Sequence, residues 1–135
     1  MNDSPLARAL ERVGDRWTLL LVDALLGGPR RFNELLEEVG GIAPNILTQR
    51  LRHLEREALL LATPYTERPR RFQYELTETG RELAGALRLL ADWGGRGGGA
   101  EPLTHTVCGT PLEARWYCPT CGEAVDEVET AVEFV

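Results

Sequence analysis

The hydrophobic periodicity of this chain changes from helical to alternating and back again, and this change limits the folds open to it. Up to residue 56 the apolar residues recur every three or four positions, which indicates a set of amphipathic helices. Over residues 59–76 they recur every second position, which indicates two strands joined as a hairpin. Helical spacing then returns up to Trp93. The order predicts an α+β, mainly α fold in which a hairpin interrupts the helices.

Glycine and proline divide the helical part into four segments. The first has apolar residues at Leu6, Leu10 and Val13, the second runs from Trp17 to Leu26, and the third carries Phe32, Leu35, Leu36 and Val39. These helices end at glycines, namely Gly14, Gly27-Gly28 and Gly40-Gly41. Pro44 suits the first turn of the fourth helix.

The hairpin is read from two alternating runs, Leu59, Leu61, Thr63, Tyr65 and then Phe72, Tyr74, Leu76. The connection at residues 66–71 is polar, contains a proline and looks too long for a two-residue turn, so it predicts a protruding basic tip. Thr77, or Thr79 with Glu82 as a capping box, opens one last helix that carries Leu83, Leu87 and Leu90.

The helix from Pro44 to Arg56 has a polar side whose composition suits DNA. At about 100° per residue, its leucines Leu47, Leu51 and Leu54 fall on one side. Opposite them lie Asn45, Gln49, Arg52 and Arg56, flanked by Thr48 and His53. Amide side chains suit adenine, Arg suits guanine or phosphate, and Thr suits backbone oxygens. The preceding short helix and the turn at residues 40–43 complete a helix-turn-helix.

A solvated polar face, which any amphipathic helix has, is the alternative interpretation of this helix. Two observations favour DNA. The outward stripe contains no acidic residue, and the hairpin tip supplies a basic wing with Arg68, Arg70 and Arg71.

The formal charge of −6 does not argue against DNA, because it is unevenly distributed. Residues 1–97 hold 14 Arg and 14 acidic residues, whereas residues 98–135 hold one Arg and seven acidic residues. Residues 44–72 carry six Arg against three Glu, a local charge of +3.

Four stretches together resemble the HxlR-type winged-helix transcriptional regulators of bacteria. They are VGDRWTLL at 13–20, GPRRFNEL at 28–35, GIAPNILTQRLRHLE at 41–55 and YELTETG at 74–80. The resemblance implies a homodimer that places its recognition helices, residues 44–57, in successive major grooves of double-stranded DNA. It implies a basic wing, residues 66–71, on the phosphate backbone. It also implies a dimer interface made by Pro5 to Val13 and Arg81 to Trp93.

The chain departs from this family pattern at two positions. Many members have a cysteine where this chain has Ser4, and a hydroxyl cannot supply the thiolate that senses oxidants there. Members often have a serine before the proline of the recognition helix, where this chain has Ala43, which cannot cap the helix. The loss of such a cap costs about 1 kcal/mol of stability.

Glycines at residues 94–99, followed by Pro102, mark the predicted boundary between a winged-helix domain, residues 1–97, and an acidic tail, residues 98–135. The tail contains His105-x2-Cys108-Gly and Cys118-x2-Cys121-Gly. Three Cys and one His at this spacing predict a structural zinc site in a zinc-ribbon-like segment, because tetrahedral zinc takes four N or S ligands. Its strands are predicted at residues 113–117 and 124–135.

Three alternatives stay open for the tail. Cys118 and Cys121 could be a redox pair, although the α/β context of such motifs is missing. A disulfide would leave one odd thiol. A ribbon that keeps its fold without metal is the most serious alternative.

The leading prediction is a sequence-specific DNA-binding regulator, and the sequence leaves unknown whether a small-molecule effector controls it. The alternative is a protein-interaction adaptor that uses a winged helix and an acidic ribbon without specific DNA binding. An enzyme is not expected, because no nucleophile–base pair, phosphate-binding glycine loop or paired carboxylates can be found. A cytoplasmic location is expected, since we see no signal sequence or membrane-spanning run and the three cysteines cannot all pair.

Overall fold

The computed structural model describes residues 3–96, 98–99 and 101–125. The chain divides into two compact units, Met1–Arg88 and Leu89–Val135, and the division falls within helix α6 (Ala84–Gly95). The boundary predicted after residue 97 lies further along the chain, past the end of that helix. None of the helices described is long and apolar enough to cross a lipid bilayer.

The first two helices begin where side-chain oxygens accept free backbone N–H groups. Helix α1 (Pro5–Val13) follows Ser4, whose hydroxyl oxygen accepts the Ala7 amide at 3.1 Å. Helix α2 (Thr18–Leu26) follows Asp15, whose carboxylate accepts the amides of Trp17 at 2.9 Å and Thr18 at 3.0 Å. Both helices occupy the predicted segments.

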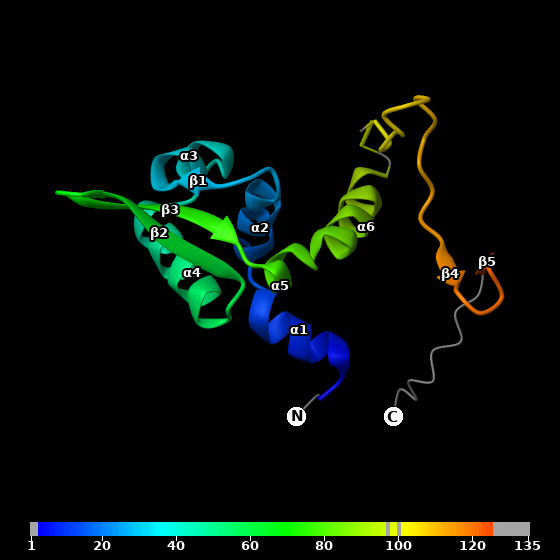
Figure 1. The fold of residues 1–135 in the computed structure, drawn as a ribbon, viewed down its shortest axis with the longest axis horizontal. Helices are drawn as coiled ribbons and strands as arrows, with labels where there is room; N and C mark the ends of the chain where they lie inside the picture. The colour runs from blue at the N-terminus through cyan, green and yellow to red at the C-terminus, as the bar shows by residue number, and fades with distance from the viewer. Residues whose placement is uncertain (1–2, 97, 100, 126–135) are drawn as a thin grey trace. The chain divides into compact units, whose positions relative to one another are not determined.

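The helix-turn-helix is formed by α3 (Phe32–Glu38) and α4 (Pro44–Arg56), as predicted (Figure 1). Between them Gly41 adopts φ +88°, a left-handed conformation that favours glycine. At the start of α4, Ala43 is the N-cap residue and contributes no side-chain hydrogen bond.

Three antiparallel strands form a sheet in the order β1-β3-β2, made of β1 (Arg30–Arg31), β2 (Leu60–Glu67) and β3 (Arg70–Leu76). Strand β1 was not predicted. It pairs Arg30 with Tyr74 and Arg31 with Gln73, so it ties the start of α3 to the hairpin. The hairpin is the wing and extends beyond the helices (Figure 1).

Two details of the hairpin differ from the sequence expectation. Glu67 pairs with Arg70, so the turn consists of only Arg68 and Pro69, joined by a cis peptide bond. The buried side of β2 begins at Leu60, and Leu61 is 53% exposed. Leu59 is also buried, but it precedes the strand and is therefore not part of the strand's alternation.

The predicted single last helix is interrupted. The short α5 (Glu78–Arg81) starts at Thr77, whose hydroxyl oxygen accepts the Gly80 amide at 3.1 Å, and α6 begins separately at Ala84. Gly80 packs closely on the backbone of Leu59, the residue before β2. A Cβ atom at position 80 would lie 2.3 Å from the carbonyl oxygen of Leu59. The same oxygen accepts the Thr77 amide at 3.0 Å.

The core of the first unit is aliphatic. Its fully buried large side chains come from α2, α3, α4 and the start of β2, and they are Leu21, Leu35, Leu47, Leu51, Leu54, Leu60 and Val22. The predicted leucine stripe of α4 therefore faces this core. Burial of each such side chain stabilises the fold by about 1.5–3 kcal/mol.

In the second unit, strands β4 (Trp116–Cys118) and β5 (Glu123–Val125) form an antiparallel pair. A second antiparallel bridge joins Thr104 to Pro111. Strand β4 overlaps the strand predicted at residues 113–117, and β5 overlaps only the start of the one predicted at residues 124–135. The remainder of that second prediction lies outside the described residues.

Candidate nucleic-acid interface

Helix α4 presents the predicted polar residues to solvent on the side away from the core. Asn45, Gln49, Arg52 and Arg56 are all exposed, while the leucine stripe is buried. Arg50 of the same helix is half-buried, and its Nη1 is 3.5 Å from Oδ2 of Asp15. The exposed face therefore carries two amide and two guanidinium side chains, and the first two turns of α4 contain no acidic residue.

The two flanking residues of this face have contacts within the protein. The Thr48 hydroxyl donates to the Pro44 carbonyl at 3.1 Å, and the residue is half-buried. His53 turns toward α1, where its Nε2 lies 2.6 Å from the carbonyl oxygen of Arg12. A carbonyl only accepts, so this nitrogen carries the proton. His53 as a DNA contact stays a prediction.

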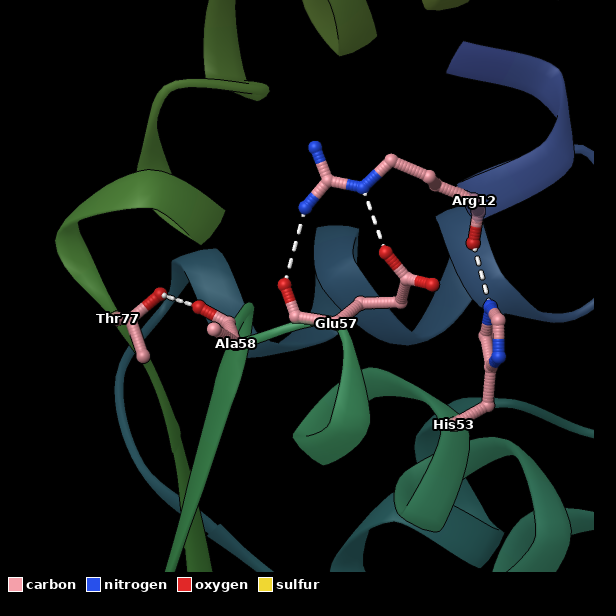
Figure 2. A network of polar contacts seen from close by, with 5 residues as sticks. All are labelled: Arg12, His53, Glu57, Ala58 and Thr77. Carbon is pink, nitrogen blue, oxygen red and sulfur yellow. Dashed lines mark hydrogen bonds and ion pairs between the residues drawn. The ribbon is translucent and has the colours of Figure 1, made fainter. Parts of the chain in front are cut away.

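The C-terminal end of α4 is held by the polar network in Figure 2. Arg12 donates from Nε to Oε2 of Glu57 at 2.7 Å and from Nη2 to the Glu57 carbonyl at 3.0 Å. The Thr77 hydroxyl donates to the Ala58 carbonyl at 2.7 Å. Ala58 has φ +57°, so the chain leaves the helix through a left-handed residue. Together with His53, these contacts join α1, α4 and the end of β3.

The wing carries its three predicted arginines on the surface. Arg68, Arg70 and Arg71 are exposed, and the Arg70 guanidinium lies 5.5 Å from the centre of the Phe72 ring. The Thr66 hydroxyl donates to the Pro69 carbonyl at 2.6 Å, which holds the two ends of the turn together.

Arg31 is a basic residue of this surface that sequence reasoning missed. Its guanidinium lies over the Tyr65 ring, 4.2 Å from the ring centre, so it links the start of α3 to the wing. Thr48 of α4, Arg31 and the wing arginines Arg70 and Arg71 line one open concavity of about 970 Å³. The tetrapeptide PRRF occurs at residues 29–32 and again at 69–72, and this repetition is the signal that could have pointed to Arg31.

Two titratable groups near this surface are shifted from their ordinary values. Burial raises the pKa of Tyr74, and the nearby carboxylate of Glu55 acts in the same direction. At Asp15 burial opposes ionisation, but hydrogen bonds from Thr18 and the Trp17 amide outweigh it, so the pKa of Asp15 is lowered. Asp15 is therefore ionised at neutral pH, where it caps α2 and faces Arg50 of α4.

The predicted metal ligands lie in two turns of the second unit. The structure brings His105 to Cys108, with Nδ1 and Sγ 3.3 Å apart, and it brings the Cys121 amide to 3.5 Å from Sγ of Cys118. Within the described part of the chain, no three His, Cys, Asp or Glu side chains meet in a metal-binding group. Hydrogen bonds with Thr110, and then with His105, lower the pKa of the Cys108 thiol to about 7.

Comparison with known proteins gives a consistent result. Residues 12–101 match the HxlR-like helix-turn-helix family. The HTH-type transcriptional regulator Rv3095 of Mycobacterium tuberculosis is 40% identical over 123 residues, which is 87% of this chain and 77% of the relative. The regulator YtcD of Bacillus subtilis is 36% identical over 85 residues, covering 63% of this chain and 68% of its own.

Solved structures share the fold. The Pseudomonas aeruginosa protein PA1374 superposes with a TM-score of 0.68 at 36% identity, over 90% of this chain and 86% of the other. The reduced form of the transcriptional regulator YodB from B. subtilis gives a TM-score of 0.61 at 29% identity, over 72% of this chain and 95% of the other.

Proposed function

Because the chain belongs to the HxlR-like helix-turn-helix family of DNA-binding transcriptional regulators, we propose that it acts as a cytoplasmic homodimer that binds two half-sites. In this proposal α4 enters the major groove and the wing lies on the phosphate backbone. The protein acts by binding DNA rather than by catalysis. The observation that carries the proposal is the exposed face of α4, with Asn45, Gln49, Arg52 and Arg56 opposite a fully buried leucine stripe.

Helix α4 and the wing are proposed to have different roles because their side chains differ in position and chemistry. Gln49 and Arg52 lie in the middle of the exposed face, and bidentate pairing of such side chains with base edges discriminates between sequences by about 1–3 kcal/mol per contact. Arg70 and Arg71 lie on a narrow hairpin, where they suit phosphate oxygens that carry no sequence information. The helix would therefore select the site, and the wing would add affinity to all sites.

Exposed apolar side chains support the homodimer. On α1, Leu6 is 68% exposed and Leu10 is 53% exposed. On α6, Trp93 is 68% exposed, and Leu90 is an exposed apolar side chain as well. A second copy of the chain that presents the same surfaces would bury them, as isologous dimers do. The polar residues between these side chains leave each helix amphipathic rather than uniformly apolar.

The test is binding to fragments selected from the host genome, measured by fluorescence anisotropy at several salt concentrations. We expect Gln49→Ala or Arg52→Ala to weaken the selected site by about 1–3 kcal/mol and to relax base preference there. We expect Arg70→Ala or Arg71→Ala to weaken all sequences alike and to flatten the salt dependence. An effect of the wing variants on specificity, with none from the helix variants, would reverse these assignments.

The homodimer has its own test. Sedimentation of the DNA-free protein at micromolar concentration should give a dimer, and Leu10→Glu should shift it toward the monomer of 15.0 kDa. A monomer in the unsubstituted protein would contradict the two-half-site arrangement.

A further inference from the structure

We propose that His105, Cys108, Cys118 and Cys121 together bind one zinc ion, which closes the second unit into a ribbon. The proposal concerns a site separate from the DNA-binding face, and its test needs no DNA. The two turns that hold these four residues have the same backbone geometry, although the residues between the ligands differ.

The two turns have matching backbones. In the first, the Gly109 amide donates to the His105 carbonyl at 2.7 Å, and in the second the Gly122 amide donates to the Cys118 carbonyl at 2.8 Å. The two glycines have φ values of +72° and +71°. In each turn a ligand-type residue occupies the first and fourth positions, so both side chains leave the same side of a tight turn. Two independent loops of one small segment share this geometry.

The first turn already holds a ligand pair at a spacing that suits a metal. Nδ1 of His105 and Sγ of Cys108 are 3.3 Å apart. Two ligands of a tetrahedral zinc ion, one nitrogen and one sulfur, lie about 3.6 Å apart when their bonds are about 2.1 and 2.3 Å long. A shift of a few tenths of an ångström would therefore admit the ion. In the second turn, the Cys121 amide points at Sγ of Cys118, which orients a thiolate for ligation.

Each turn closes a hairpin. The first lies inside the Thr104–Pro111 bridge, and the second lies between β4 and β5. Residues 112–115, which connect the hairpins, belong to neither helix nor strand, so a bend there can bring the two ligand pairs together. The structure shows the pairs apart, and the ion is what would hold them in one group of four.

Among the residues that the structure describes between 101 and 125, none is buried, so they form no core that could replace a metal. Trp116 and Tyr117 are each 65% exposed, and Val107 is 85% exposed. Residues 102–135 number 34, and a segment of fewer than about 40 residues usually needs a metal, a disulfide or a partner to fold. Three thiolates and one imidazole fill all four positions of tetrahedral zinc and leave none for water, so the ion would be structural.

Titration of the reduced full-length protein with Co²⁺ tests the proposal, since Co²⁺ reports tetrahedral thiolate ligation by its absorption bands and Zn²⁺ displaces it. We expect one equivalent per chain, full displacement by one equivalent of Zn²⁺, and protection of all three thiols from a thiol reagent. His105→Ala and Cys121→Ser should each weaken binding at least tenfold. Their neighbours in the same turns, Thr106→Ala and Thr120→Ala, are the matched controls and should bind as the unsubstituted protein does.

Four results would overturn the proposal. They are the absence of tetrahedral bands, unchanged binding by His105→Ala, a stoichiometry of one ion per two chains, and a disulfide between Cys118 and Cys121 in the freshly purified protein. Circular dichroism of each variant separates these results from loss of folding, because the helices of the first unit dominate the signal and contain none of the four ligands.

Discussion

The guanidinium group of Arg12 contacts Glu57 at two points, its carboxylate at 2.7 Å and its backbone carbonyl at 3.0 Å (Figure 2). Arg12 belongs to the last turn of α1, and Glu57 follows the last residue of α4. The Arg12 carbonyl in turn accepts from His53. The helix proposed to contribute to the dimer interface is therefore bonded directly to the end of the helix proposed to contact bases.

We expect Arg12→Ala to lower the free energy of unfolding by about 1 kcal/mol, because it removes a half-exposed ion pair and a charged hydrogen bond to a carbonyl. Glu57→Gln keeps the carbonyl contact and should cost about half as much. Urea denaturation measures both changes. Arg8→Ala, at an exposed position of the same helix, is the control, and an equal loss there would mean that removal of a positive charge from α1, and not the Glu57 contact, is responsible.

Asp15 gives the stability a defined pH dependence. Its folded pKa lies below the ordinary value of 3.8, so its contribution is complete above that value and is lost as the pH falls through the folded pKa. We expect Asp15→Asn to cost about 0.5–1 kcal/mol at neutral pH, because the amide can still accept the Trp17 and Thr18 N–H groups but loses the charge that faces Arg50. The difference between variant and unsubstituted protein should shrink as the pH falls below 3.8 and through the lowered folded pKa. Asp23→Asn, at an exposed position of α2, should show no such convergence.

The missing cap of α4 can be supplied. Ala43 has the extended backbone of an N-cap residue, with φ −74° and ψ 144°, and it is exposed, so a serine side chain fits there. We expect Ala43→Ser to raise the free energy of unfolding by about 1 kcal/mol. Ser4→Ala removes the existing cap of α1 and should lower it by a similar amount. Thermal denaturation of both variants would show whether the changes have opposite signs.

Arg31 should act on DNA through its charge and its position over Tyr65. We expect Arg31→Ala to weaken binding to all sequences and to reduce the salt slope by about 1. Arg30→Ala is the contrasting neighbour, because Arg30 is bound to Glu38 at 2.5 Å and to the Gly28 carbonyl at 3.1 Å. It should reduce stability and leave the salt slope unchanged. A salt slope that responds to Arg30 and not to Arg31 would contradict this assignment.

Local sequence signals predicted α4 accurately. Pro44 marks its start, and Leu47, Leu51 and Leu54 mark its buried side, so neither bound depends on residues far away in the chain. The exposed face followed from the same periodicity. The family resemblance likewise rested on short stretches that the structure places around α2, α3 and α4 and at the end of β3 and in α5, and it was confirmed by the family match over residues 12–101.

The features that were missed depend on contacts between distant segments. Strand β1 is two residues long and exists because it pairs with β3, more than 40 positions later in the chain, and Arg31 meets Tyr65 for the same reason. His53 looked like part of the exposed face because the helical pattern cannot show that α1 ends beside it. The turn at Arg68 and Pro69 was predicted to be longer than it is, because Glu67 and Arg70 pair across it and both are polar, so the hydrophobic alternation does not reach them.

Gly80 affects how such a protein can change over generations. A side chain at this position would collide with the backbone of Leu59, so a single substitution requires two separate stretches of chain to move at once. The exposed positions of α4, such as Asn45 and Gln49, carry no such constraint. Mutation can therefore alter the recognition surface one residue at a time, whereas Gly80, which packs on the Leu59 carbonyl between α4 and β2, accepts no larger residue without a backbone shift.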